Sequence, residues 1–236
     1  MPEVARREAK SIALLSSMAP RAILSAAAEE YWLIYGVRIE ADAAGGVDVV
    51  RRIEAGETVD IVVLSSDAID KLIASGQLAR NGRHDLMTSG IAVAVKSGAE
   101  APDLSDEDAT RRTILAAPSI SYSTGPSGRY LGSLFERWGI LEDLRPRIVV
   151  PSPGIAVASL VSSGSVALGF QQLSEMLGVP GIRVVGSLPR AIQHWTTFTG
   201  ATSSSALEDT AAEKFLLYLA SPQRQALKQR FGMAGL

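Results

Sequence analysis

The order of apolar and polar positions along the chain predicts strands and helices in alternation. Short apolar runs lead through small residues into segments whose apolar positions recur at intervals of three and four, the pattern of an amphipathic helix. The first strands are expected at Ser11–Leu15, Val37–Ala41 and Asp60–Leu64. The last of these is continuously apolar, which predicts burial on both faces. Three strand–turn–helix units in a row predict an α/β fold with a parallel sheet.

The alternation continues through the second half of the chain. The acidic stretch 97–108 is expected to be surface loop, as is the pair His84–Asp85. Two helices close the chain, and Ser221–Pro222 has the N-cap and first-turn residues that open the second one. Further strands are expected at Ile91–Val95, Ser119–Tyr122, Ile148–Val150, Ala167–Gln171, Ile182–Val185 and His194–Phe198.

The stretch Ser119–Ile140 carries the strongest candidate chemistry. A strand there passes through the small residues 123–128 into a helix with an apolar face of aromatic and leucine side chains. Unpaired N–H groups and the positive end of the dipole meet at a helix start, which predicts a site for a small anion. Arg129, in the first helical turn, could add a planar fork of donors for a carboxylate. The alternative for Arg129 is an ordinary place on the helix surface.

Four turns share this arrangement of a strand end, small residues and a helix start. They cover residues 16–20, 43–47, 123–128 and 152–155. In an open parallel sheet such turns lie beyond the carboxyl ends of the strands, where ligands bind. Each β–α connection also needs a cap and a tight turn, so any one of them is open to a purely structural explanation. Four together favour a shared binding cleft.

The composition of the chain excludes several classes of function. The 236 residues carry a formal net charge of −2, so the chain lacks the basic footprint of a nucleic-acid-binding protein. The absence of Cys excludes disulfides and thiolate metal sites, and His84 and His194 lack a partner at zinc-site spacing. Neither a Walker A motif, a dinucleotide fingerprint nor a G-x-S-x-G elbow is present. We therefore expect no cofactor and no metal.

The sequence also bears on location. The apolar run Ile12–Leu15 that follows the charged first ten residues is too short for a signal peptide, and no stretch approaches a membrane span. The chain as written is therefore expected in the cytoplasm, or in the periplasm if a native leader has been removed.

Two segments and the order of elements support a family resemblance. The segment 53–65 reads I-E-A-G-E-T-V-D-I-V-V-L-S, and 168–172 reads L-G-F-Q-Q. From Ser11 to Gly232 the chain resembles the molybdate-binding-protein-like group of type II periplasmic binding proteins. The resemblance implies two α/β lobes, each a mostly parallel sheet flanked by helices, that close on an anion. We expect one lobe at 11–90 plus 200–236 and the other at 91–199, with strand crossings near 89–95 and 195–199.

The resemblance also implies a set of contacts. In this family hydroxyls and backbone amides hold the oxyanion, and molybdate binders add a Tyr near the end of a G-I-V-Y strand. The corresponding strand here reads Gly169–Gln172 and lacks that Tyr, which with Arg129 favours a carboxylate over a tetrahedral oxyanion. The expected ligand-binding residues are Ser16, Ser17, Gly45, Gly46, Ser127, Gly128, Arg129, Gly154, Ile155 and Gln172.

Two functions remain open. The first is a solute-binding protein that delivers a small anion, expected to be a carboxylate, to an ABC permease. The second follows from a similarity to aconitate isomerases of the same family, which shift a double bond in a tricarboxylate. That reaction needs a positioned proton acceptor and donor, with Arg and amides to hold charge. His194 is a candidate base or a hydrogen-bonded neighbour, and the fold alone does not choose between the functions.

Overall fold

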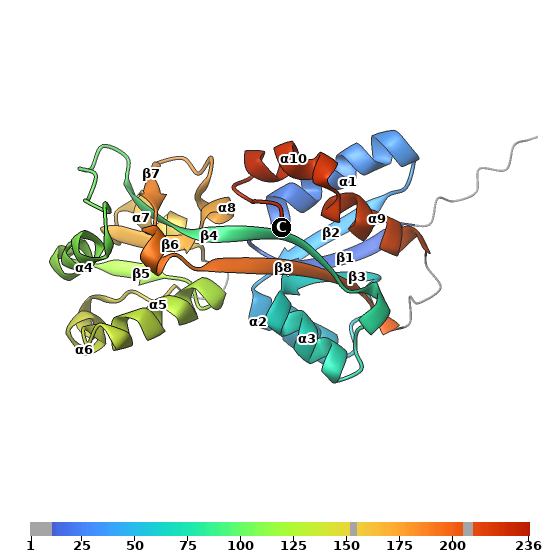
Figure 1. The fold of residues 1–236 in the computed structure, drawn as a ribbon, viewed down its shortest axis with the longest axis horizontal. Helices are drawn as coiled ribbons and strands as arrows, with labels where there is room; N and C mark the ends of the chain where they lie inside the picture. Colours follow the sequence, from blue (N-terminus) through green and yellow to red (C-terminus); the bar gives the residue numbers. More distant parts are fainter. Residues whose placement is uncertain (1–10, 152–154, 205–209) are drawn as a thin grey trace, which may run out of the picture. The chain divides into compact units, whose positions relative to one another are not determined.

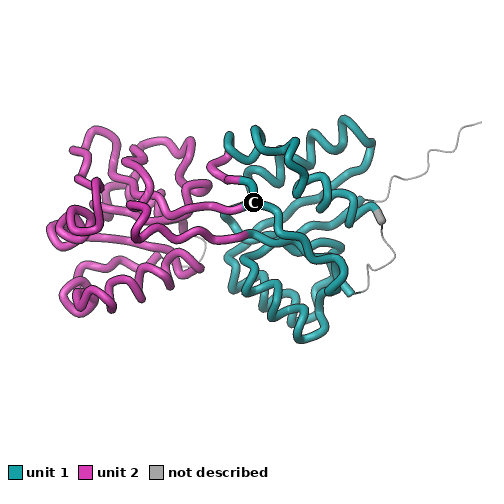
Figure 2. The backbone as a smooth tube through the Cα atoms, viewed as in Figure 1, with its two compact units in different colours: residues 1–87, 198–230, 235–236 teal, residues 88–197, 231–234 magenta. Residues whose placement is uncertain are grey.

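The computed structural model describes residues 11–151, 155–204 and 210–236. It is a mixed α/β fold in which helices flank a sheet of strand order β2-β1-β3-β8-β4-β6-β5, with β7 paired to β4 (Figure 1). The chain forms two compact units (Figure 2). Unit 1 comprises the residues up to 87, 198–230 and 235–236, and unit 2 comprises 88–197 and 231–234. The chain passes between the units within β4 and within β8.

Unit 1 is built on three parallel strands. Register pairs Leu14 of β1 with Ala41 of β2 on one side and with Ile61 of β3 on the other. All five residues of β3 are buried, as its continuous apolar run predicts. Helices α2 and α3 cover one face of this sheet, while α1, α9 and α10 lie on the other (Figure 1). The elements are β1 Ile12–Ser17, α1 Arg21–Tyr35, β2 Ile39–Ala44, α2 Gly46–Glu54, β3 Ile61–Ser65, α3 Ser66–Ala74, α9 Thr210–Ala220 and α10 Gln225–Arg230.

Unit 2 packs helices on both faces of a second group of strands. Along β4, Ile91 and Val93 face a core shared with α4, α5 and α6, whereas Ala92 and Ala94 face α7 and α8. This alternation follows from the two-residue period of a strand. The elements are β4 His84–Lys96, α4 Glu107–Ala116, β5 Ile120–Tyr122, α5 Pro126–Arg137, α6 Leu141–Leu144, α7 Val157–Ser163, β6 Leu168–Gln172, α8 Leu173–Met176, β7 Ile182–Ser187 and β8 Trp195–Thr202.

A short segment near the C-terminus belongs to unit 2. Thr88 and Ala234 exchange backbone hydrogen bonds of 2.9 and 2.8 Å, and the Ser89 hydroxyl donates to the Gly232 carbonyl at 3.2 Å. These bonds fix residues 231–234 against β4.

Two sequence expectations for local structure were wrong. His84 and Asp85 open the long strand β4 and do not form a loop, because Asp85 accepts hydrogen bonds from neighbouring side chains, among them Thr199 at 2.6 Å. The expected strand Ile148–Val150 makes only an isolated bridge to Ile120. The polar stretch 97–108 lies at the surface as expected, and its last two residues begin helix α4, whose start is capped by Asp106 accepting from the Ala109 N–H at 2.7 Å.

Candidate functional site

Three strand ends meet at one edge of unit 1. Because β1, β2 and β3 are parallel, their carboxyl ends lie side by side, with Ser16 opposite both Ala43 and Val63. Ser17, the last residue of β1, is opposite Ala44, so it lies beside the turn that leads through Gly45 into α2. The end of β3, where α3 begins, belongs to the same edge; the sequence analysis did not include it. The candidate residues of unit 1 are therefore together.

The two serines differ in their hydrogen bonding. Ser16 is buried, and its hydroxyl lies 3.0 Å from the Ser17 carbonyl oxygen and 3.5 Å from the Asp42 carbonyl oxygen. The Ser17 hydroxyl oxygen is also buried, but within the described part of the chain it has no hydrogen-bond partner. A buried hydroxyl without a hydrogen-bond partner costs free energy until a partner forms that bond. Of the two hydroxyls, that of Ser17 is thus the one whose hydrogen-bonding capacity is unused.

The start of α2 leaves space and donors beside Ser17. Gly45 is the N-cap residue, and no side chain among the described residues accepts from the first N–H groups of the helix. A Cβ added at Gly46 would meet the Ser17 Cβ at 3.8 Å, an ordinary van der Waals distance. Neither glycine has positive φ. Packing therefore does not explain Gly46, and a glycine at this position would let an oxygen atom approach the backbone N–H groups closely.

In unit 2 the turn between β5 and α5 is tightly closed. A Cβ at Gly128 would lie 1.5 Å from the Ser123 carbonyl oxygen, so only glycine fits this position. Ser127 is buried and its hydroxyl lies 3.0 Å from that of Ser123. One of these hydroxyls donates to the other, which leaves the acceptor's own proton for a further partner. Gly128 thus has a packing role whatever else it does.

The other candidates of unit 2 lie near this turn or outside the described residues. Arg129 is exposed in the first turn of α5, and its N–H donates to Gly125. Ile155 precedes α7 and is 48% exposed; Gly154 lies outside the described residues. Tyr122 packs edge-on against Phe135 at 5.9 Å in the core.

His194 lies near the C-terminal end of the unit 2 sequence and contacts Tyr130 near the start of α5. Its ring is stacked on Tyr130, with ring centroids 4.6 Å apart. The Tyr130 hydroxyl donates to the Ile192 carbonyl at 2.9 Å, which fixes the phenol ring. His194 therefore packs on the residue that follows Arg129 in the sequence.

Two glutamines end β6 and bind different partners. Gln172 is buried and its Nε2 donates to the Thr196 hydroxyl at 2.7 Å, while its Oε1 has no partner among the described residues. Gln171 donates from Nε2 to the Glu175 carboxyl at 2.8 Å and lies 3.4 Å, through Oε1, from the Ala158 N–H. Burial raises the pKa of Glu175 to about 7, against the opposing effect of the Gln171 hydrogen bond.

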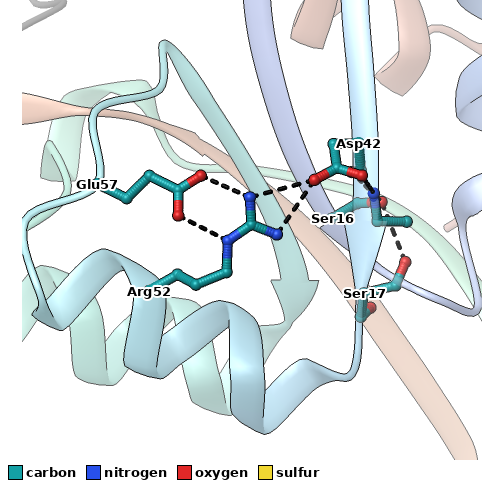
Figure 3. A network of polar contacts seen from close by, with 6 residues as sticks. Ser16, Ser17, Asp42, Arg52 and Glu57 are labelled. Atoms are coloured by element: carbon teal, nitrogen blue, oxygen red, sulfur yellow. Dashed lines mark hydrogen bonds and ion pairs between the residues drawn. The ribbon is translucent and has the colours of Figure 1, made fainter. Parts of the chain in front are cut away.

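A network of charges lies beside the unit 1 turn (Figure 3). Arg52 of α2 bonds the Asp42 carboxylate through both terminal nitrogens at 3.1 Å. It also bonds Glu57 through Nε and Nη2, both at 2.6 Å. Asp42, Arg52 and Glu57 are separated in the sequence. They come together only when β2 and α2 are folded, so the sequence alone does not show this network.

Comparison with known proteins decides the family. Residues 12–234 match the family described as bacterial extracellular solute-binding protein. The chain belongs to this family. Among solved structures, the periplasmic molybdate-binding protein of Azotobacter vinelandii has a TM-score of 0.78 at 18% identity, over 95% of this chain and 99% of that one. A sulfate-binding protein of Mycobacterium tuberculosis has a TM-score of 0.75 at 17% identity, over 95% of this chain and 86% of that one. At these identities the likeness shows the fold.

A curated relative is more similar in sequence. An aconitate isomerase from Pseudomonas sp. is 36% identical over 228 residues, which cover 93% of this chain and 86% of the relative. The two-lobed α/β fold class and the molybdate-binding-like resemblance expected from the sequence are confirmed by these matches. Every helix within the described ranges is too short or too polar to cross a membrane.

Proposed function

We propose that this solute-binding-family chain binds a small organic carboxylate, and that the aconitates are the first ligands to test. The observation that carries the proposal is the buried, unpartnered Ser17 hydroxyl beside the start of α2, whose N-cap is a glycine. Hydroxyl and amide donors at a helix start suit an anionic oxygen. Arg129 adds a guanidinium in the first turn of α5, and its planar fork suits a carboxylate. The 36% identical relative is named for a tricarboxylate reaction.

The test is a thermal-shift screen of the purified chain against molybdate, sulfate, phosphate, citrate, cis-aconitate and trans-aconitate. A ligand that binds only the folded state raises the unfolding midpoint as its concentration rises. We expect a shift with a tricarboxylate, reduced in Ser17→Ala. Ser75→Ala is the matched control, because that hydroxyl donates to the Leu72 carbonyl at the far end of α3. If every carboxylate leaves the midpoint unchanged, the proposal is wrong.

A second candidate function is isomerisation of the bound aconitate. It is favoured by the named activity of the curated relative and by Glu175, whose pKa of about 7 suits a group that accepts and returns a proton at neutral pH. Proton NMR of cis-aconitate incubated with the chain distinguishes the two functions. Appearance of the trans isomer, lost in Glu175→Gln, supports the enzyme. Tight binding without conversion supports a solute-binding protein that serves an ABC permease.

A further inference from the structure

Two carboxylates flank the turn that is proposed to hold an anion. Asp42 lies on β2 two residues before the end of the strand, and its Oδ1 accepts from the Ala43 N–H at 2.8 Å. The Asp48 carboxylate lies 3.0 Å from the position of a Cβ added at Gly45. A negative charge beside an anion site opposes binding unless a cation compensates it. The negative charges of these two carboxylates must therefore be compensated if an anion is to bind at this turn.

Each acid is paired with an arginine of α2. Asp48 is bonded by Arg51 at 2.5 Å on the helix surface. Asp42 is bonded by Arg52, both of whose terminal nitrogens lie 3.1 Å from its Oδ2 (Figure 3). The same guanidinium binds both oxygens of Glu57, and these hydrogen bonds lower the pKa of Glu57. The Arg52 guanidinium is thus bonded both to Glu57, which follows α2, and to Asp42 on β2.

The Asp42 residue connects this pair to the candidate serines. Its carbonyl oxygen lies 3.5 Å from the Ser16 hydroxyl, and its carboxylate is bonded to the next amide in the turn. The Asp42 Oδ1 accepts a hydrogen bond from the Ala43 N–H, and the Asp42 Oδ2 accepts from Arg52. Both oxygens are therefore occupied within unit 1, and the orientation of the carboxylate is fixed from two sides.

We propose that Arg52 is a positioning residue for the anion site of unit 1, which compensates the Asp42 carboxylate and holds the β2–α2 turn in its binding conformation. The inference rests on the proposed function, because it assumes that an anion binds at this turn. It assigns to Arg52 no direct contact with the ligand. Its effect on affinity passes through the charge of Asp42.

Calorimetric titration of trans-aconitate tests the charge. We expect Arg52→Gln to weaken binding by about tenfold or more. Asp42→Asn removes the acid and should not weaken binding, and the double variant Asp42→Asn/Arg52→Gln should return to within about threefold of the wild type. The deficit of Arg52→Gln should shrink in 1 M NaCl, because salt screens exposed charges. A role confined to holding the turn predicts equal losses in both single variants and no rescue, which would overturn the proposal.

A matched control and a ligand-free measurement complete the test. Arg145 forks onto an exposed carboxylate of unit 2 in the same way, with contacts to Glu142 of 3.1 and 2.6 Å, so Arg145→Gln makes the same charge change elsewhere and should bind as the wild type does. Hydrogen exchange of the Ala43 amide should accelerate in Arg52→Gln without any ligand, and unchanged exchange would also overturn the proposal. If the wild type binds no carboxylate, the proposed function fails, while the exchange measurement still decides whether Arg52 holds the β2–α2 turn.

Discussion

Gln171 and Glu175 are joined by a hydrogen bond of 2.8 Å from the amide Nε2 to the carboxyl Oε1. The pair links the end of β6 to α8, and Gln171 also lies 3.4 Å from the Ala158 N–H of α7. A hydrogen bond from an amide favours the charged carboxylate, yet burial is the larger effect and raises the pKa to about 7. Unit 2 therefore contains a carboxyl that titrates at neutral pH.

This pKa predicts how stability depends on pH. Between 4.5, the ordinary value, and about 7, folded Glu175 keeps a proton that the unfolded chain has released. Its contribution to stability is therefore complete below pH 4.5 and is lost as pH rises through 7, with a limit on the order of 3 kcal/mol. Glu175→Gln stays neutral, keeps the acceptor oxygen and should lose this dependence. Urea unfolding at pH 5 and pH 8 measures it.

Glu142→Gln is the control for that experiment. Arg145 lowers the pKa of the Glu142 carboxyl below 4.5, so this group titrates below the chosen window. The difference in unfolding free energy between pH 5 and pH 8 should therefore match the wild type in Glu142→Gln. An equal difference in Glu175→Gln as well would show that another group causes it.

The sheet could be predicted from the sequence because its signals are local. Short apolar runs specified β1 and β3, and Gly36 and Gly76 ended helices with φ of 66° and 80°. The raised pKa of Glu175 could not be predicted, because desolvation depends on what packs around α8. The Arg52 network was missed for the same reason: Asp42 approaches it only when β2 and α2 are folded. Helix α4 was missed because its exposed polar residues obscure a narrow apolar face.

Gly128 gives a prediction that needs no ligand. A methyl group there would fall 1.5 Å from a backbone oxygen of the β5–α5 turn, so the turn must open. Gly128→Ala should destabilise the chain by about 3 kcal/mol or more, measured by urea unfolding. Gly132 of the same helix is the matched control, since a Cβ there meets nothing within 4 Å. Gly132→Ala should stabilise by up to about 1 kcal/mol, and equal effects of the two changes would contradict the role given to Gly128.

The end of β6 predicts weak binding of tetrahedral oxyanions. Phe170 is fully buried and has no hydroxyl, and Gln172 stands where the resemblance expects the Tyr of molybdate binders. With this orientation of the Gln172 amide, one of the two N–H groups of Nε2 bonds Thr196 and Oε1 is an acceptor, so this side chain does not supply the hydroxyl donor that the Tyr gives to an oxyanion. Calorimetry should give a Kd for molybdate above about 10 μM, which corresponds to a binding free energy weaker than about −7 kcal/mol. Micromolar or tighter binding would refute this interpretation.

Arg129 provides the sharpest test of carboxylate recognition. It lies in the first turn of α5, two residues after the buried Ser127. A bidentate contact to a carboxylate loses on the order of 2–5 kcal/mol when one partner is removed, about 30-fold or more in affinity. Arg129→Ala should show that loss for trans-aconitate in calorimetry. Arg129→Lys should recover little, because an ammonium cannot reproduce the planar fork.

Arg137, the last residue of the same helix, supplies the control. Arg137→Ala removes the same charge from α5 about 12 Å farther along its axis, at 1.5 Å per residue, and should bind as the wild type does. Because Arg129 is exposed, the unfolding free energy without ligand should barely change in either variant. Equal affinities of the wild type, Arg129→Lys and Arg129→Ala would leave the hydroxyls and amides of the turns as the anion donors. A loss shared by Arg137→Ala would instead assign the effect to the overall charge of the helix.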